Sequence, residues 1–186
     1  MTYLELYNAL DHVDHSRAKR MGMSKLLASN PSRVATLLEI AFQVDDPVSC
    51  KASWVLEFML KEHLNYLFPS MDTFVRHIGS VHLDPAVRPM AKICEVLMKS
   101  YFQSKDQETR DALNEEHLES ITSTCFDWLI GNHKVAAQAY AMTCLLLLGR
   151  KFDWIHPELR SILEQNYPNG SAAYKARARM TLAKLR

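Results

Sequence analysis

The segment Asp84-Pro85-Ala86-Val87-Arg88-Pro89-Met90-Ala91 decides the predicted fold, because variants of it recur along the chain. Each variant has a capping residue, then a small apolar residue, then alanine four positions further on. The other three variants are Asp46-Pro47-Val48-Ser49-Cys50-Lys51-Ala52, Asn132-His133-Lys134-Val135-Ala136-Ala137-Gln138-Ala139 and Asn169-Gly170-Ser171-Ala172-Ala173-Tyr174-Lys175-Ala176. Aligned on Val48, Val87, Val135 and Ala172, they lie 39, 48 and 37 residues apart. That period is typical of helical solenoids, in which one helix pair cannot bury its apolar face without a neighbour.

Apolar residues recur three and four positions apart between these starts, which predicts amphipathic helices. No stretch shows the strict alternation of a half-buried strand, so the sequence predicts an all-α protein. We expect about ten helices, at roughly 2–12, 15–29, 31–43, 47–62, 70–79, 85–103, 106–130 with a break near Leu113-Asn114, 133–149, 154–166 and 171–185.

The residues Asp84, Val87, Arg88 and Ala91 resemble the second helix of HEAT repeats. In that family the Asp and Arg usually form a ladder between neighbouring repeats. Only Asp46 and Asp84 match the acidic position and only Arg88 the basic one, so a complete ladder is not expected. The resemblance implies a right-handed α–α superhelix, a HEAT/ARM-like solenoid of about four helical-hairpin repeats. We expect one domain over residues 1–186, with a polar insertion near 104–116 where the spacing is longest.

More narrowly, the chain resembles a family of short bacterial HEAT-like proteins that are often labelled adenylosuccinate lyase. The matching segments are Trp54-Val55-Leu56-Glu57-Phe58, Ala86-Val87-Arg88-Pro89, Phe126-Asp127-Trp128-Leu129, Asp153-Trp154-Ile155-His156-Pro157 and Ala172-Ala173-Tyr174-Lys175-Ala176-Arg177. True lyases of that type are more than twice as long and carry a Ser-rich loop containing Met-Pro-Lys. This chain has no such loop, so we expect no lyase activity.

The composition is that of an ordinary folded domain, with 48% apolar residues, 23% charged residues and a net charge of +1. This small net charge does not indicate binding to nucleic acid or to a membrane. The uncharged run Val135 to Leu148 has 14 residues, whereas spanning a bilayer takes about 20. The cysteines Cys50, Cys94, Cys125 and Cys144 lie in apolar stretches without a CxxC pair, which indicates buried free thiols and a reducing compartment. An acidic N-terminus (Met1 to Glu5) argues against export, and we expect a cytoplasmic protein.

Motifs for chemistry are weak. Asp11, His12 and His15 share a helix face, but a metal site needs further ligands that the sequence does not indicate. We interpret this stretch as a solvated helix end capped by Asp14. Neither a nucleophile elbow nor a glycine-rich phosphate loop is present. We therefore expect no catalytic residues, no metal and no cofactor, and a protein that is not an enzyme.

Glu57 and Glu95 occupy otherwise apolar helices in successive repeats. Two acids in a cleft can perform acid–base chemistry, but we favour ion pairs with Arg88, Lys92 or Lys51. The three tryptophans, Trp54, Trp128 and Trp154, lie on apolar stripes and are expected in the core.

The main hypothesis is a non-enzymatic module that binds a protein or peptide on the concave face of its second helices. The expected contact residues are Lys51, Glu57, Arg88, Lys92, Glu95, Lys134, Gln138, Lys175 and Arg179.

The alternative is nucleic-acid binding, or a HEAT-like DNA-repair glycosylase, using the basic terminal helices. Asp127-Trp128 and Asp153-Trp154 resemble part of the residue set of such glycosylases. The basic residues are Arg17, Lys19, Arg20 and Lys25 near one end, and Lys175, Arg177, Arg179, Lys184 and Arg186 at the other. Helical geometry places Lys175, Arg179 and Arg186 on one side of the last helix and Arg177 and Lys184 on the other, with Ala173, Ala176, Met180 and Ala183 packing between them.

Overall fold

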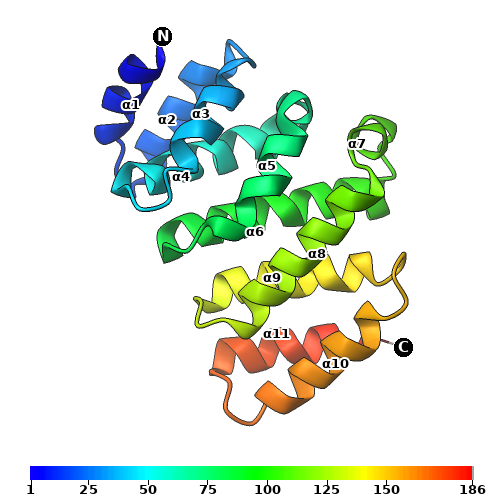
Figure 1. The fold of residues 1–186 in the computed structure, drawn as a ribbon. Helices are drawn as coiled ribbons and strands as arrows, with labels where there is room; N and C mark the ends of the chain where they lie inside the picture. Colours follow the sequence, from blue (N-terminus) through cyan, green and yellow to red (C-terminus); the bar gives the residue numbers. More distant parts are fainter. Residues whose placement is uncertain (186) are drawn as a thin grey trace. The chain divides into compact units, whose positions relative to one another are not determined.

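The computed structural model describes residues 1–185, and in that range the chain is all-α, with eleven α-helices and no strands (Figure 1). It divides into two compact units, Met1–Ile93 and Cys94–Arg186, and the division falls inside one helix, α6 (Asp84–Lys99). Arg186, which belongs to the predicted basic set, lies outside the described residues.

The first unit is organised around helix α4 (Pro47–Glu62), which packs against each of the three helices before it. The elements of this unit are α1 (Tyr3–Asp11), α2 (Arg17–Ala28), α3 (Arg33–Ala41), α4, the 3₁₀ segments η1 (Leu64–Ser70) and η2 (Ile78–Ser80), α5 (Met71–His77) and the first turns of α6. The core contains Leu10, Leu37 and Leu56, which are completely buried. Their burial removes apolar surface from water and is the main stabilising term of the unit.

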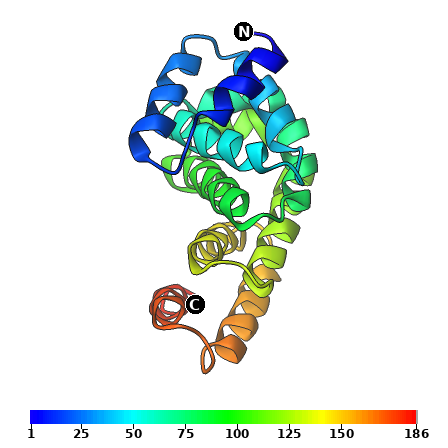
Figure 2. The same cartoon turned by 90° about the vertical axis from the view of Figure 1, so that its left-hand side faces the viewer.

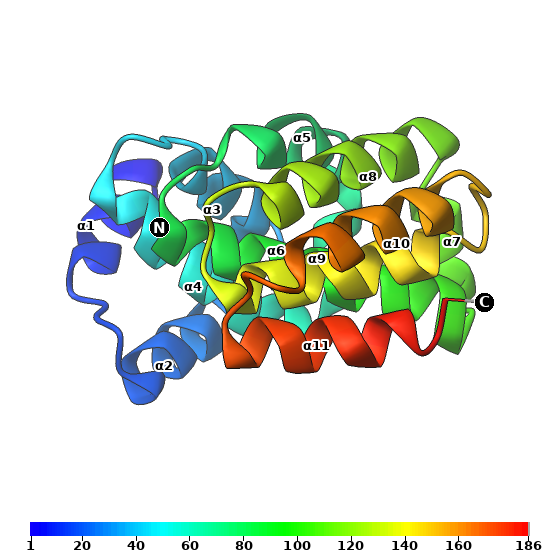
Figure 3. The ribbon, with the colours of Figure 1, turned by 90° about the horizontal axis from the view of Figure 1, so that it is seen from below.

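The second unit contains two successive helical hairpins. Its elements are the end of α6, the π-helical turn η3 (Ser100–Ser104), α7 (Gln107–Ala112), α8 (Glu115–Ile130), α9 (Val135–Leu148), α10 (Ile155–Asn166) and α11 (Ala172–Leu182). Helix α9 packs against α8, α10 and α11, which explains why it carries no charged residue. Helices α9 and α11 run alongside each other, with α8 and α10 forming a second layer (Figures 2 and 3).

Helix starts follow the capping signals of the sequence. Asp46 caps α4 by accepting a hydrogen bond from the Val48 backbone N–H at 2.9 Å, and Pro47 occupies the first helical position. Two predicted starts are wrong in detail. Helix α3 begins two residues after Pro31, and α2 is capped by Ser16 rather than Asp14. Asp14 instead accepts a hydrogen bond from the Ser16 backbone N–H at 2.9 Å. Hydrogen bonding by the Ser16 side chain, and then by Lys19, lowers the pKa of Asp14.

Pro89 leaves a carbonyl without its helical donor, as the sequence predicts for a proline inside a helix. The carbonyl concerned is that of Pro85, four residues earlier. In the structure it accepts a hydrogen bond of 2.7 Å from the Trp54 indole N–H of α4. An aromatic side chain of α4 therefore replaces the backbone donor that the proline removes.

Gly149 caps the C-terminus of α9, at a point where the backbone passes close to the side chain of His156. A Cβ atom at this position would lie 2.0 Å from Cδ2 of His156. That ring is in place because its Nε2 lies 3.0 Å from the Leu146 carbonyl oxygen. The glycine therefore allows the α9–α10 connection to close.

The predicted break near Leu113-Asn114 is confirmed, because α7 ends at Ala112 and Asn114 caps α8. Dividing that segment gives eleven α-helices in the described residues instead of about ten. The polar stretch 104–116 contains α7, and its Asp106 caps this short helix.

The apolar face predicted for the last helix is wrong. Ala173, Ala176, Met180 and Ala183 are exposed, with 55% of Met180 open to solvent. The residues that face the interior are Tyr174, Ala178, Thr181 and Leu185. The larger side chains Tyr174 and Leu185 determine the orientation, because they bury more surface than an alanine stripe can.

All four cysteines are free and buried, as predicted. Burial and the neighbouring Cys144 thiol raise the pKa of Cys94 well above its usual value. For Cys125, a hydrogen bond with Cys144 makes the largest contribution to a similar rise in pKa. Protonated, enclosed thiols of this kind act as small apolar side chains.

Candidate binding sites

A groove lined by four positively charged side chains lies in the second unit, across three helices. Lys99 ends α6, Arg150 follows α9, and Arg177 and Lys184 come from α11 and the turn after it. The cavity has a volume of about 310 Å³, and its other lining residues are Gln103, Thr143, Leu146, Leu147, Met180 and Thr181. We call these ten residues the cationic groove.

Glu95 forms ion pairs with two of these cations, Lys99 and Arg177. Only 2% of its surface is exposed, and its Oε1 lies 2.9 Å from Lys99 Nζ and 3.8 Å from an Arg177 nitrogen. Arg177 also donates a hydrogen bond to the Thr143 hydroxyl of α9. A carboxylate buried this deeply requires paired cations, so the positions of Lys99 and Arg177 are fixed together.

The groove has an excess of positive charge. Glu95 balances one of its four cations, and no acidic residue lines the cavity. In the described part of the chain, Arg150 and Lys184 form no ion pair, and the buried Nε of Arg177 has no hydrogen-bond partner. Uncompensated cations in a recess attract an anionic ligand and strengthen its hydrogen bonds.

Two predicted site residues form the expected ion pair. Glu57 of α4 is buried, and its Oε2 lies 2.6 Å from Arg88 of α6, with a second contact of 3.3 Å to Oε1. This bidentate contact joins α4 and α6 and is one of the ion pairs that the sequence predicts for Glu57. Lys51 was expected beside these groups, but its Nζ lies 2.6 Å from Asp11 Oδ1 of α1.

The other predicted residues do not form one cluster. For Glu95 the sequence predicts partners among Lys51, Arg88 and Lys92, and the structure adds ion pairs with Lys99 and Arg177, which the sequence did not predict. Gln138 donates to the backbone carbonyls of Leu129 and Gly131, and Arg179 donates to the Tyr167 hydroxyl. Lys92 and Lys175 are partly buried, and Lys134 is exposed just before α9.

Sequence reasoning missed Lys99, Arg150 and Thr143. Only Lys99 had a usable signal, because it lies four residues after Glu95 and so on the same helix face. The meeting of Thr143 and Arg177 joins residues 34 positions apart, and no local pattern encodes it.

No family model, curated protein or solved structure significantly matches this chain. Among the described residues there is no group of three or more His, Cys, Asp or Glu side chains placed to hold a metal ion. In the same range, every helix is too short or too polar to cross a membrane.

The tryptophans have three different environments. Trp128 is buried as predicted, and the partly buried Trp54 forms the hydrogen bond to Pro85. The prediction that Trp154 lies in the core is wrong, because 57% of its surface is exposed. It stacks on Phe126, with 5.6 Å between the ring centroids, beside a recess of about 350 Å³.

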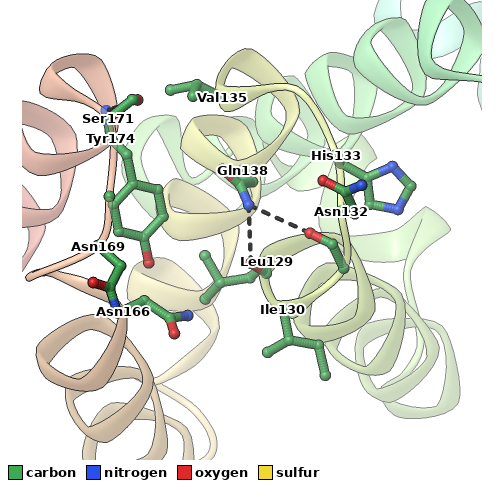
Figure 4. Close-up of a pocket in the computed structure, with 12 residues that line it drawn as sticks. Leu129, Ile130, Asn132, His133, Val135, Gln138, Asn166, Asn169, Ser171 and Tyr174 are labelled. Carbon is green, nitrogen blue, oxygen red and sulfur yellow. Dashed lines mark hydrogen bonds between the residues drawn. The ribbon is translucent and has the colours of Figure 1, made fainter.

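A second polar cavity lies where the two hairpin connections of the second unit meet (Figure 4). Its volume is about 450 Å³. The lining residues are Leu129, Ile130, Gly131, Asn132, His133, Val135, Gln138, Asn166, Asn169, Gly170, Ser171 and Tyr174. We call it the amide pocket, since four of its side chains are carboxamides.

Proposed function

We propose that this chain is a HEAT-like α-solenoid that binds an acidic segment of a partner protein and has no catalytic role. The observation that carries the proposal is the cationic groove, with its three unbalanced positive charges in a recess of about 310 Å³. This charge comes from the end of α6, from α11 and from the turns that follow α9 and α11, and these three helices are the second helices of the proposed repeats. Their repeated spacing and the two stacked hairpins of the second unit support the solenoid assignment.

Hydrogen-bonding chemistry favours a carboxylate-rich partner. Arg177 is held by Thr143 and Glu95, so its guanidinium loses little freedom when a ligand binds. Leu146, Leu147 and Met180 line the same recess and can contact the aliphatic part of a peptide. A recess with both apolar and cationic lining residues suits a peptide that carries both apolar and acidic side chains.

A fluorescence anisotropy titration tests the proposal. The probe is a fluorescein-labelled eight-residue peptide that contains four glutamates and two leucines. We expect saturable binding at physiological salt, and a loss of at least about tenfold in affinity for both Arg177→Glu and Lys184→Glu. Lys25→Glu is the matched control, since it makes the same charge change on α2 outside the groove. Equal losses in all three variants would refute a specific groove.

A nucleic acid is the second candidate, because the same four cations can contact backbone phosphates. Its affinity would fall steeply with salt, by about 0.9 log unit per tenfold rise in salt for each phosphate neutralised. Titration of duplex DNA from 50 to 200 mM salt distinguishes the two. Tight DNA binding that Arg177→Glu and Lys184→Glu abolish, without peptide binding, would replace the peptide proposal.

A further inference from the structure

Tyr174 of α11 is buried, with 4% of its surface exposed, yet its hydroxyl makes no hydrogen bond of good geometry within the described residues. Burial raises the pKa of this hydroxyl, and the neighbouring Asn166 side chain partly offsets the rise. Buried polar groups without a partner are uncommon because each one costs desolvation free energy. Figure 4 shows the Tyr174 ring extending into the amide pocket, on the side where Asn166 and Asn169 lie. An unsatisfied donor that reaches into a cavity indicates a ligand atom that accepts its proton.

Two helices begin at the edge of this pocket. Val135 is the first residue of α9, and no side chain caps that helix. Ser171 caps α11 by accepting from the Tyr174 backbone N–H at 3.2 Å. The first turns of both helices carry partial positive charge and backbone N–H groups that are free of helical partners. Both features favour a negatively charged ligand.

The remaining polar side chains of the pocket are mainly carboxamides, together with His133. No lysine, arginine, aspartate or glutamate lines it, and the carboxamides of Asn132, Asn166 and Asn169 offer N–H donors. Gln138 is held in place, because its Nε2 donates to the carbonyls of Leu129 and Gly131 (Figure 4). A phosphate dianion would require cationic partners, whereas a carboxylate carries one charge that dipoles and hydroxyls can stabilise.

We infer that the amide pocket binds a carboxylate, with the Tyr174 hydroxyl as a donor and the N-termini of α9 and α11 as the source of positive potential. The volume of about 450 Å³ exceeds what the carboxylate alone would fill, so the ligand carries further polar atoms that face the asparagines. Such a carboxylate belongs either to a small organic acid or to the C-terminus of a peptide. This site is separate from the cationic groove and shares no lining residue with it.

NMR titration of ¹⁵N-labelled protein tests the inference, with sodium acetate and N-acetylglycylglycine as probes and acetamide as the neutral isostere. Sodium chloride at equal ionic strength reports the general salt effect. We expect saturable shifts at Val135, Ser171 and Tyr174 with the two carboxylates only. Tighter binding of the dipeptide than of acetate would assign the site to a peptide C-terminus, and equal binding to a small acid. Equal shifts with acetamide or chloride would overturn the inference.

The variant Tyr174→Phe removes the hydroxyl and keeps the ring. It should weaken carboxylate binding about tenfold, the effect of one hydrogen bond to a charged group. The control is Tyr167→Phe, since the Tyr167 hydroxyl accepts hydrogen bonds from Arg179 and does not line the pocket. Thermal unfolding separates the roles, because Tyr174→Phe should not lower the melting temperature. Unchanged carboxylate affinity in Tyr174→Phe would also overturn the inference.

Discussion

Glu95→Gln removes the buried charge that anchors the cationic groove and nearly preserves the shape of the side chain. The hydrogen bond from Lys99 at 2.9 Å joins two charged groups, and such bonds contribute about 1.5–3 kcal/mol. Lys99 keeps 43% exposure, so solvent screening places its contribution at the lower end of that range. The weaker contact with Arg177 at 3.8 Å adds to it. We expect a loss of about 2 kcal/mol in the free energy of unfolding.

Urea unfolding followed by circular dichroism measures this loss. The matched control is Glu164→Gln, which also removes a carboxylate paired four residues away, but one that is 59% exposed and lies 3.7 Å from Arg160. That change should cost less than about 0.5 kcal/mol. If Glu95→Gln cost no more than Glu164→Gln, Glu95 would not be a structural anchor and the reasoning would fail.

Three further predictions concern the second unit. Gly149→Ala should destabilise the protein by about 1–3 kcal/mol in urea unfolding, because the Cβ of the new alanine would collide with His156. A smaller loss of stability in a His156→Ala background would confirm that this collision is the cause. Met180→Ser should change stability by less than about 0.5 kcal/mol because Met180 is exposed, whereas Ala178→Leu should cost about 1–3 kcal/mol because Ala178 is buried. The opposite order would mean that the buried face of α11 is the one predicted from sequence. The Thr109 hydroxyl and backbone N–H hold the pKa of Asp106 below its usual range. The contribution of Asp106 to stability is therefore present above its unfolded pKa and is lost as the pH falls through its folded pKa. Asp106→Ala should unfold more easily than the wild type at pH 7 and equally at pH 2.

The helices could be predicted from sequence because their signals are local. The proline after Asp46 and the break near Leu113-Asn114 are signals that act within a few residues, and the structure has helix caps at Asp46 and Asn114. The effect of Pro89 was predictable for the same reason. That Trp54 would supply the missing donor was not, since it lies 31 residues from Pro85.

The orientation of α11 could not be predicted because alanine provides little contrast. Ala173 and Ala176 are exposed while Ala178 is buried, although all three have the same side chain. The choice depends on how Tyr174 fits the second unit, which is a tertiary property. The prediction that Arg177 and Lys184 share a side of this helix did hold, and both line the cationic groove.

The candidate sites were less predictable than the fold. Arg88 was among the three partners expected for Glu57, because the two residues lie on second helices of neighbouring expected repeats, and the structure pairs them. Glu95 was recognised as unusual, but its partner Arg177 is 82 residues away and belongs to a different proposed repeat. Ion pairs of that range depend on how helices stack, and one sequence does not contain that information.

The most direct measurement is an NMR titration of the labelled protein with the unlabelled acidic peptide at physiological salt. The proposal predicts saturable shifts at Gln103, Thr143, Arg150 and Lys184, which all line the groove. Shifts confined to the basic run of α2, or their absence at saturating peptide, would contradict binding in the groove.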